Sequence, residues 1–448
     1  MGAPTRIVVL QRPSQPLDVM CARLRGWGYS VRGFGSSVEM IPTLSRLDTD
    51  VVLIDAGVPD SLPVVSQIKA DPRTRSLPVV AATVEDAGVI AANALALGAD
   101  DVLTLPVDDA ELYARIRALS RLSAMELELA RREVVLAEFG VGSAPEGPPV
   151  PGADRISILL VGPASALQIQ VTTALGGAAS VASAETPERA LERLRRHDMD
   201  IVVITGVRDH GQLERLCAEI RSDPSLFDLP VMLIGRVHDF PDRVLPLHWG
   251  VSDLLFQPFH PEILRLRVQG WVRQQRLRRR LRGGLDGAAL PPTTDRLTRL
   301  YSHGFVNGYL EHAIAHALHA GAPLALAAFG VIKMARVNQE YGFAAGDRLL
   351  AQLGTLIARS TRAEDLPARM GGDLFCIALN GTSRQEALSV TERIAGLITE
   401  NAFPIGHDHS IRIGLRTGVS DLSRADDITA FVGRAFERMQ VFGIRRAS

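Results

Sequence analysis

Two short groups of residues that could bind a nucleotide lie close together in the last third of the chain. Arg362 and Asp365 are separated by two residues, and Gly371-Gly372-Asp373 follows a few positions later. An arginine fork can bond a phosphate or the O6/N7 edge of guanine, and a carboxylate can accept from guanine N–H groups. An exposed Arg–Asp pair can also form a surface ion pair worth about a few tenths of a kcal/mol. Taken alone, the two residues fit either a guanine-nucleotide site or a surface ion pair.

The glycine pair predicts a hairpin that carries Asp373 at its tip. Apolar runs at 366–370 and 374–379 flank the turn residues on both sides. Paired glycines tolerate the positive φ that a tight hairpin needs. We therefore expect two adjacent strands with residues 371–373 between them.

The block from Arg362 to Phe375 resembles the signature of the GGDEF domain, the fold of diguanylate cyclases. In that family the hairpin tip belongs to the active site, and an Arg-x-x-Asp five residues before it binds the product, cyclic di-GMP, as an inhibitor. The resemblance implies that Arg362 and Asp365 bind cyclic di-GMP. It also places the family's second ligand-binding arginine at Arg393, on the helix after the hairpin. At this spacing from the hairpin we favour ligand binding over the surface ion pair.

The same resemblance implies that the catalytic positions are damaged. The hairpin reads Gly-Gly-Asp-Leu-Phe, so Leu374 stands where the family has a carboxylate. Gly330 replaces a metal-binding aspartate, and Ala335 and Gln440 replace lysines that contact phosphate. Joining two GTP molecules needs a metal ion to stabilise the developing charge, and this electrostatic help is often the largest catalytic contribution. We therefore expect no Mg²⁺ in this site and no enzyme activity.

Three positions of the nucleotide site are retained. Asn338 and Asp347 match positions that bind guanine in active relatives, and Asp373 remains at the hairpin tip. An Asn carbonyl and an Asp carboxylate can both accept from the guanine N1 and N2 edge. Asp347 could instead cap a helix that we predict over 348–357, so both roles stay open for it.

The first 280 residues or so contain the same α/β pattern twice, at an offset of about 150 residues. Strands are predicted at 6–10, 50–55, 77–82 and 98–106, and again at 200–205, 229–232 and 250–258. Strands that alternate with helices imply parallel sheets, and strands this apolar need both faces covered. Both copies resemble the receiver domain of two-component response regulators. Two receivers followed by a GGDEF domain is the layout of the PleD-type regulators, here in a catalytically degenerate form.

The receiver resemblance makes Asp55 a possible phosphoacceptor with an incomplete metal site. Thr83 matches the family's threonine, but Gln11-Arg12 replaces the acidic pair that holds Mg²⁺, and Leu105 replaces the lysine. In the second copy these positions have all been lost, with Thr205 in place of the acceptor. The second receiver is therefore expected to serve as an adaptor or dimerisation surface, and the resemblance implies a homodimer through the receivers.

The predicted organisation is an α/β multidomain chain. Two doubly wound, flavodoxin-like parallel sheets precede an α+β GGDEF domain with a central, mostly antiparallel sheet. The expected segments are receiver 1 with a long last helix (1–139), a Pro/Gly linker (140–154), receiver 2 (155–282), a second linker (283–294) and the GGDEF domain (295–448).

Composition excludes several classes of protein. Lys+Arg 49 against Asp+Glu 50 gives no global attraction to nucleic acid or to an anionic membrane. No apolar run is long enough to span a bilayer, and the start does not read as a signal peptide. The three cysteines are far apart and fit a reducing compartment. We expect a cytoplasmic protein, with its arginine-rich run near residue 280 on a solvated helix.

Three functions remain open at this point. The first is a non-catalytic cyclic di-GMP receptor that relays the ligand to partner proteins. For this function the family resemblance adds cell-cycle control, recruitment to a cell pole and regulated proteolysis. The second is a weak diguanylate cyclase that makes cyclic di-GMP from two GTP molecules. The third is a scaffold switched by phosphorylation of Asp55.

Overall fold

The computed structural model divides into two compact units, and the division falls within two helices, α5 (Asp109–Glu138) and α10 (Pro261–Asp286). The N-terminal unit combines Thr5–Glu126 with Glu146–Leu277, and the C-terminal unit combines Leu127–Pro145 with Arg278–Ser448. The structure describes residues 5–11, 15–44, 49–58, 61–84, 87–141, 155–177, 179–206, 209–223, 225–242, 244–286, 293–406 and 409–442.

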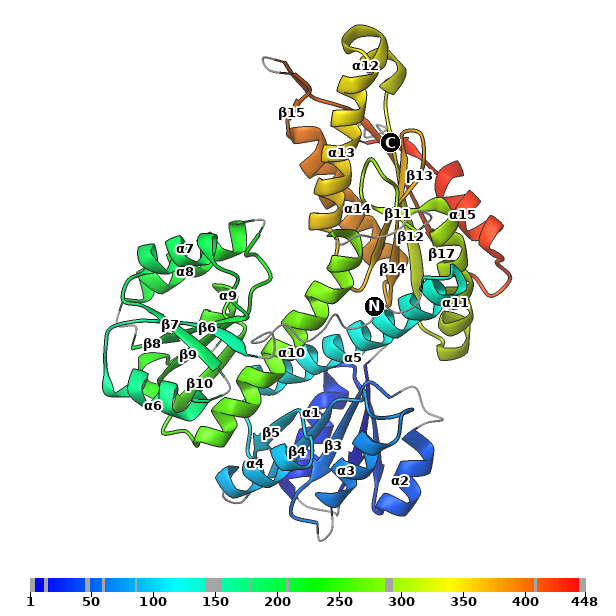
Figure 1. Cartoon of the computed structure of the whole chain (residues 1–448). Helices are drawn as coiled ribbons and strands as arrows, with labels where there is room; N and C mark the ends of the chain where they lie inside the picture. The colour runs from blue at the N-terminus through cyan, green and yellow to red at the C-terminus, as the bar shows by residue number, and fades with distance from the viewer. Residues whose placement is uncertain are drawn as a thin grey trace. The chain divides into compact units, whose positions relative to one another are not determined.

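Within its described residues, the N-terminal unit contains two five-stranded parallel sheets with equivalent strand orders, β2-β1-β3-β4-β5 and β7-β6-β8-β9-β10 (Figure 1). The first sheet comprises β1 (Arg6–Leu10), β2 (Ser30–Phe34), β3 (Val51–Asp55), β4 (Val79–Thr83) and β5 (Asp101–Thr104). The second comprises β6 (Ile156–Val161), β7 (Ala179–Ala184), β8 (Ile201–Thr205), β9 (Val231–Arg236) and β10 (Asp253–Gln257). This order is that of the flavodoxin-like doubly wound fold. The predicted fold class is confirmed for both copies.

Helices cover both faces of each sheet because successive strand residues point to opposite faces. Val9 and Leu53 belong to one buried cluster of the first sheet, and Val8 and Ile54 belong to another. The helices of the first copy are α1 (Gln15–Gly26), α2 (Ser37–Leu44), α3 (Pro63–Ala70), α4 (Ala87–Ala96) and the first half of α5. Those of the second are α6 (Ala166–Leu175), α7 (Pro187–Arg196), α8 (His210–Ser222), the 3₁₀ turn η1 (Val237–Asp239), α9 (Leu245–His248) and most of α10.

The C-terminal unit is built on a mostly antiparallel sheet, as predicted. Its order in the described residues is β11-β13-β14-β12-β17-β18, and only β11 pairs in parallel, with β13. The strands are β11 (Tyr301–Ser302), β12 (Leu324–Val331), β13 (Leu366–Gly371), β14 (Leu374–Asn380), β17 (Leu415–Asp421) and β18 (Gln440–Val441), beside a small ribbon of β15 (Phe403–Pro404) and β16 (Ser410–Ile411). The helices are α11 (His303–Ala320), α12 (Met334–Tyr341), α13 (Phe343–Ser360), α14 (Arg384–Glu400) and α15 (Ile428–Glu437).

The end of α5 belongs to the core of the C-terminal unit. Val135 is fully buried in one cluster with side chains of α11 and of the central strands. Phe139, just beyond the helix, places its ring 5.9 Å from that of Phe305. A helix that starts in the first receiver therefore ends as part of the GGDEF-domain core.

Two predicted boundaries were wrong. The helix predicted over 348–357 is α13, which starts at Phe343 with Gly342 as its N-cap. Asp347 lies inside this helix, so the capping role that we left open for it does not hold. The helix predicted to end at residue 282 continues to Asp286, through the start of the predicted second linker. The first predicted linker, 140–154, lies outside the described residues except for Gly140 and Val141.

The long helices α5 and α10 are continuous, and both carry charged side chains along their length. In the part of the chain that the structure describes, no helix is both long and apolar enough to cross a membrane.

Candidate functional site

The Gly-Gly-Asp segment forms the predicted hairpin between β13 and β14. Gly371 and Gly372 have φ of 118° and 56°, which only glycine adopts readily. Arg369 fixes the tip, because its guanidinium donates to Gly372 O at 2.7 Å and to Asp295 Oδ1 at 3.1 Å. Burial alone would raise the pKa of Asp295, but hydrogen bonds from Thr298 and Arg369 outweigh it and hold the pKa below its usual value. Sequence analysis missed this Arg369–Asp295 pair.

A cavity of about 760 Å³ opens beside the hairpin tip. Asn338, Asp347 and Asp373 all line it, so the structure brings together the three retained positions of the nucleotide site. Three cationic side chains that sequence analysis missed, Lys333, Arg369 and Arg416, line the same cavity. No local signal in the sequence points to Arg416, because only the register of a strand distant in the chain places it opposite Gly330.

The residues at the family's metal position do not fit a divalent cation. Gly330 pairs with Leu374 on one side and with Arg416 on the other. A Cβ added at Gly330 would lie 3.2 Å from Leu374 Cδ2, 3.3 Å from Met439 Cε and 3.7 Å from Arg416 Nη2. These neighbours are apolar or cationic, whereas Mg²⁺ prefers oxygen ligands. Among the described residues, no group of three or more His, Cys, Asp or Glu could hold a metal ion.

The Arg-x-x-Asp segment forms a tight turn between α13 and β13, in which Asp365 N donates to Arg362 O at 3.2 Å. Arg362 and Arg393 are both exposed. Arg393 Nη2 donates to Ser360 O at 2.9 Å, so this arginine of α14 lies beside the turn that carries Arg362. The structure therefore places Arg393 beside the end of α13, two residues before Arg362.

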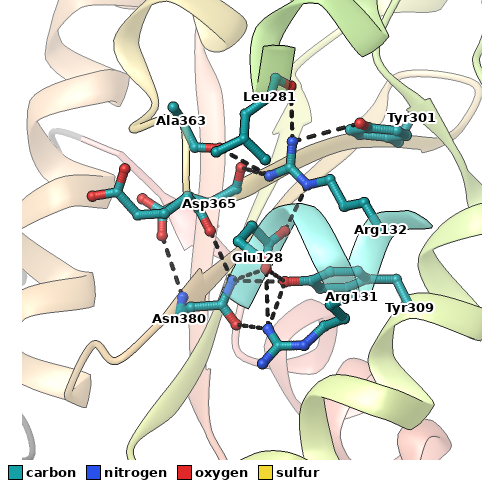
Figure 2. Close-up of polar contacts among 10 residues, drawn as sticks. Glu128, Arg131, Arg132, Leu281, Tyr301, Tyr309, Ala363, Asp365 and Asn380 are labelled. Atoms are coloured by element: carbon teal, nitrogen blue, oxygen red, sulfur yellow. Dashed lines mark hydrogen bonds and ion pairs between the residues drawn. The ribbon is translucent and has the colours of Figure 1, made fainter. Parts of the chain in front are cut away.

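Asp365 differs from the two arginines because it is buried, with 3% of its surface exposed. Its carboxyl group accepts from Asn380 N at 3.2 Å (Figure 2). Burial, helped by the charge of Glu364 and partly opposed by Arg362, raises the pKa of Asp365 to about 8. The alternative reading of a surface Arg–Asp ion pair was therefore wrong.

We expect Asp365 to make folding stability depend on pH. The folded chain keeps the Asp365 proton up to a pKa of about 8, whereas an unfolded aspartate loses it near pH ~3.9. Between these values the folded state binds one more proton, so stability should fall as pH rises, by at most about 1.4 kcal/mol per pH unit. Asp365→Asn keeps a neutral side chain and should lose this slope. Denaturant unfolding of both proteins from about pH 5 to about pH 8 checks this, and equal slopes would contradict it.

The first receiver places Asp55 at the carboxyl end of β3, where its Oδ1 accepts from Gly57 N at 2.9 Å. Thr83 ends the neighbouring strand β4 and is buried. Where the family has its acidic pair, Gln11 donates through its amide to Asp18 Oδ1 at 3.1 Å, and Arg12 lies outside the described residues. Asp55 and Thr83 thus take the expected strand-end positions, and Asp55 remains a possible phosphoacceptor only as a prediction.

In the second receiver, the residue at the phosphoacceptor position is buried. Thr205 is fully buried and its hydroxyl donates to Val161 O at 3.4 Å. A Cβ on Gly162 would lie 2.1 Å from Thr205 O, so no side chain fits beside that strand end. This arrangement agrees with the expectation that the second copy lacks phosphotransfer groups.

Comparisons with known proteins agree with the two folds. The family model "Diguanylate cyclase, GGDEF domain" matches residues 292–442, and "Response regulator receiver domain" matches residues 15–117. Response regulator PleD of Caulobacter vibrioides is 28% identical over 438 residues, which cover 96% of this chain and 95% of PleD. Diguanylate cyclase DosC of Escherichia coli is 27% identical over 147 residues, which cover 33% of this chain and 32% of DosC.

Among solved structures, the GGDEF domain of DgcB from Caulobacter crescentus in complex with c-di-GMP is similar to the C-terminal part. It is 20% identical with a TM-score of 0.32, and the match covers 33% of this chain and 85% of that domain. With a receiver domain, a GGDEF domain and similarity to PleD along 96% of its length, the chain is a PleD-like response regulator.

Proposed function

We propose that this protein is a non-catalytic cyclic di-GMP receptor that binds the dinucleotide at Arg362, Asp365 and Arg393. The observation that carries the proposal is the pair of exposed arginines at one turn, with Arg393 Nη2 2.9 Å from Ser360 O. Each guanidinium can bond a phosphate or the O6/N7 edge of guanine with two parallel hydrogen bonds, and its plane can stack on a purine. Cyclic di-GMP has two guanines and two phosphates, so two guanidinium groups suit it. We propose that two molecules of the ligand bind together as a stacked dimer.

The surroundings of the hairpin tip support the absence of catalysis. Leu374 and Met439 occupy the space beside Gly330, and the nearby charge is the guanidinium of Arg416. Asp373 is the one carboxylate retained at the tip, and a single carboxylate seldom holds a catalytic metal pair. We propose that Mg²⁺ has no role in this site.

The proposed output is a change in the arrangement of the protein that its partner proteins recognise. A ligand can shift such an equilibrium only through different affinities for the two arrangements. The chain resembles PopA, a degenerate paralogue of PleD, and by that resemblance we propose cell-cycle control, recruitment to a cell pole and adaptor function in regulated proteolysis. A homodimer formed through the receiver domains is part of the same proposal.

Calorimetric titration of the full chain with cyclic di-GMP tests the proposal. Saturable binding with a Kd of about micromolar or tighter is the expected result. The absence of binding by the folded wild-type protein would overturn the proposed function.

A further inference from the structure

The cavity beside the hairpin tip has charged and polar walls that the proposed receptor function does not use, and we call it the hairpin cavity. Its volume of about 760 Å³ lies in the range of about 300–1,000 Å³ that is typical of small-molecule sites. The described residues that line it do not include Arg362, Asp365 or Arg393. The hairpin cavity is therefore a second candidate site, separate from the Arg-x-x-Asp turn.

Arg416 brings a positive charge to the place where the family has a metal-binding aspartate. It pairs with Gly330 across two strands, and its Nη2 lies 3.7 Å from the position of a Cβ on Gly330. A guanidinium repels a divalent cation, but it can bond two phosphate oxygens in parallel. The group that excludes a metal from this place can thus balance the charge of a phosphate itself.

Lys333 adds a second positive charge to the wall of the cavity. It directly precedes α12 and has φ of 61°, in the left-handed region that residues other than glycine rarely adopt. Residues held in such conformations cluster at ligand sites. In the part of the chain that the structure describes, neither Lys333 nor Arg416 forms a hydrogen bond or an ion pair. Both charges are therefore open to an anionic ligand.

The remaining charges near the hairpin tip do not cancel these two cations. Arg369 donates to Asp295 Oδ1 at 3.1 Å, so these two residues balance each other. Asp373 lines the cavity and opposes an anion. With Lys333 and Arg416 against Asp373 alone, this part of the cavity has a net positive charge.

The other polar wall of the cavity suits the edge of a guanine base. A Cβ on Gly346 would overlap the Asn338 side chain, so Asn338 lies against α13 directly beside Asp347. Asn338 Oδ1 is buried and has no hydrogen-bond partner among the described residues, which leaves an acceptor for an N–H group. The two oxygens of a carboxylate such as Asp347 can accept from guanine N1–H and N2–H together. Adenine presents a donor beside an acceptor at that edge and cannot pair in this way.

We propose that the hairpin cavity binds a guanosine 5′-phosphate without a divalent cation, with Arg416 and Lys333 on its phosphate groups and Asp347 and Asn338 on its base. Lys333 and Asn338 are five residues apart at α12, which separates them by roughly 7 Å along the helix axis. A nucleotide likewise separates its base from its phosphates by the length of a sugar. The inference goes beyond the proposed function and does not depend on it, because the two sites share no residue.

The test is calorimetric titration of GTP into the full chain, once with EDTA and once with Mg²⁺. Saturable binding with a Kd of about 100 μM or tighter is expected in EDTA. Mg²⁺ should leave the affinity unchanged or lower it, since the ion neutralises the phosphate charge that Arg416 and Lys333 bind. ATP should bind at least about tenfold more weakly, because Asp347 would then face an unpaired acceptor.

Two variants locate the ligand and separate the metal-free site from a metal site. Arg416→Gln should weaken GTP binding by about tenfold or more, since it removes a charge-assisted bond. Arg412→Gln is the matched control, because Arg412 is exposed in the segment before β17 and is not among the residues that line the cavity. Asp373→Asn should bind GTP as tightly as wild type or more tightly, whereas a metal site would lose its carboxylate ligand and its affinity. Circular dichroism confirms that each variant is folded.

The outcomes distinguish this inference from the receptor proposal. No GTP binding by the folded wild type, binding that requires Mg²⁺, or equal binding by Arg416→Gln and Arg412→Gln would each overturn it. Loss of GTP binding in Arg362→Ala would also overturn it, because GTP would then occupy the Arg-x-x-Asp turn. Cyclic di-GMP titration of Arg416→Gln should match wild type, so a failure of either proposal leaves the other standing.

Discussion

Replacing Arg362 by alanine is expected to weaken cyclic di-GMP binding by about 10- to 100-fold. Hydrogen bonds to a charged group contribute about 1.5–3 kcal/mol each, and about 1.4 kcal/mol corresponds to a tenfold change in affinity. Arg362 is exposed, so its replacement should change stability little. Calorimetric titration of wild type and variant, with thermal unfolding as a check, measures the effect.

Arg359→Ala is the matched control for this prediction. Arg359 is exposed in the last turn of α13, three residues before Arg362, and its removal changes the net charge by the same amount. A loss of affinity in both variants would indicate general attraction of an anion rather than a specific site. Arg393→Ala should lose affinity like Arg362→Ala, because the Arg393 guanidinium bonds Ser360 O, two residues before Arg362.

The purified protein is expected to release no pyrophosphate and form no cyclic di-GMP from GTP with either Mg²⁺ or Mn²⁺. Loss of one electrostatic stabiliser typically lowers kcat by about 10²–10³. Here the metal carboxylate position is Gly330, and the hairpin carboxylate position is Leu374. Together the losses predict a rate at least ~10⁴-fold below that of an active cyclase.

The diguanylate cyclase DosC serves as the positive control for the assay. Gly330→Asp alone should not restore turnover, since its Cβ would lie 3.2 Å from Leu374 and 3.3 Å from Met439. Product formed by the wild-type chain would instead favour the weak-cyclase hypothesis. That product must also disappear in Asp373→Asn, which removes the remaining hairpin carboxylate.

Much of the fold follows from local sequence signals. The strand Arg6–Leu10 was predicted with its observed bounds, because a short apolar run with turn signals leaves few alternatives. The hairpin was predicted from Gly371-Gly372, whose positive φ values have a local cause. Helix ends were less predictable, as α13 shows. Its first residue, Phe343, is 77% exposed. It therefore does not belong to the buried face whose periodic apolar residues predict a helix.

The second linker was misjudged for a related reason. Gly283-Gly284 reads as the end of a helix, because glycine costs about 1 kcal/mol relative to alanine inside one. In the structure, α10 continues to Asp286. Leu281, just before the glycines, is buried and its carbonyl accepts from Arg132. This tertiary anchoring comes from a residue 149 positions away and leaves no local signal.

The candidate site shows the same division between local and long-range causes. The closeness of Asn338, Asp347 and Asp373 was implied by the family resemblance, and all three line one cavity. The burial of Asp365 was not foreseen, because its contacts are long-range: Arg132, which bonds its main-chain carbonyl, lies 233 positions earlier in the chain. Arg416 was also missed, since its place opposite Gly330 depends on the register of two strands far apart in sequence.

Amide hydrogen exchange of the full chain with and without cyclic di-GMP tests the central claim most directly, because it locates the ligand. We predict slower exchange in peptides that cover residues 360–366 and 389–396, which contain Arg362, Asp365 and Arg393. Peptides around Asn338, Asp347 and the hairpin tip should not change. Protection confined to that cavity would contradict the account, because it would place the ligand beside the hairpin tip and not at Arg362 and Arg393.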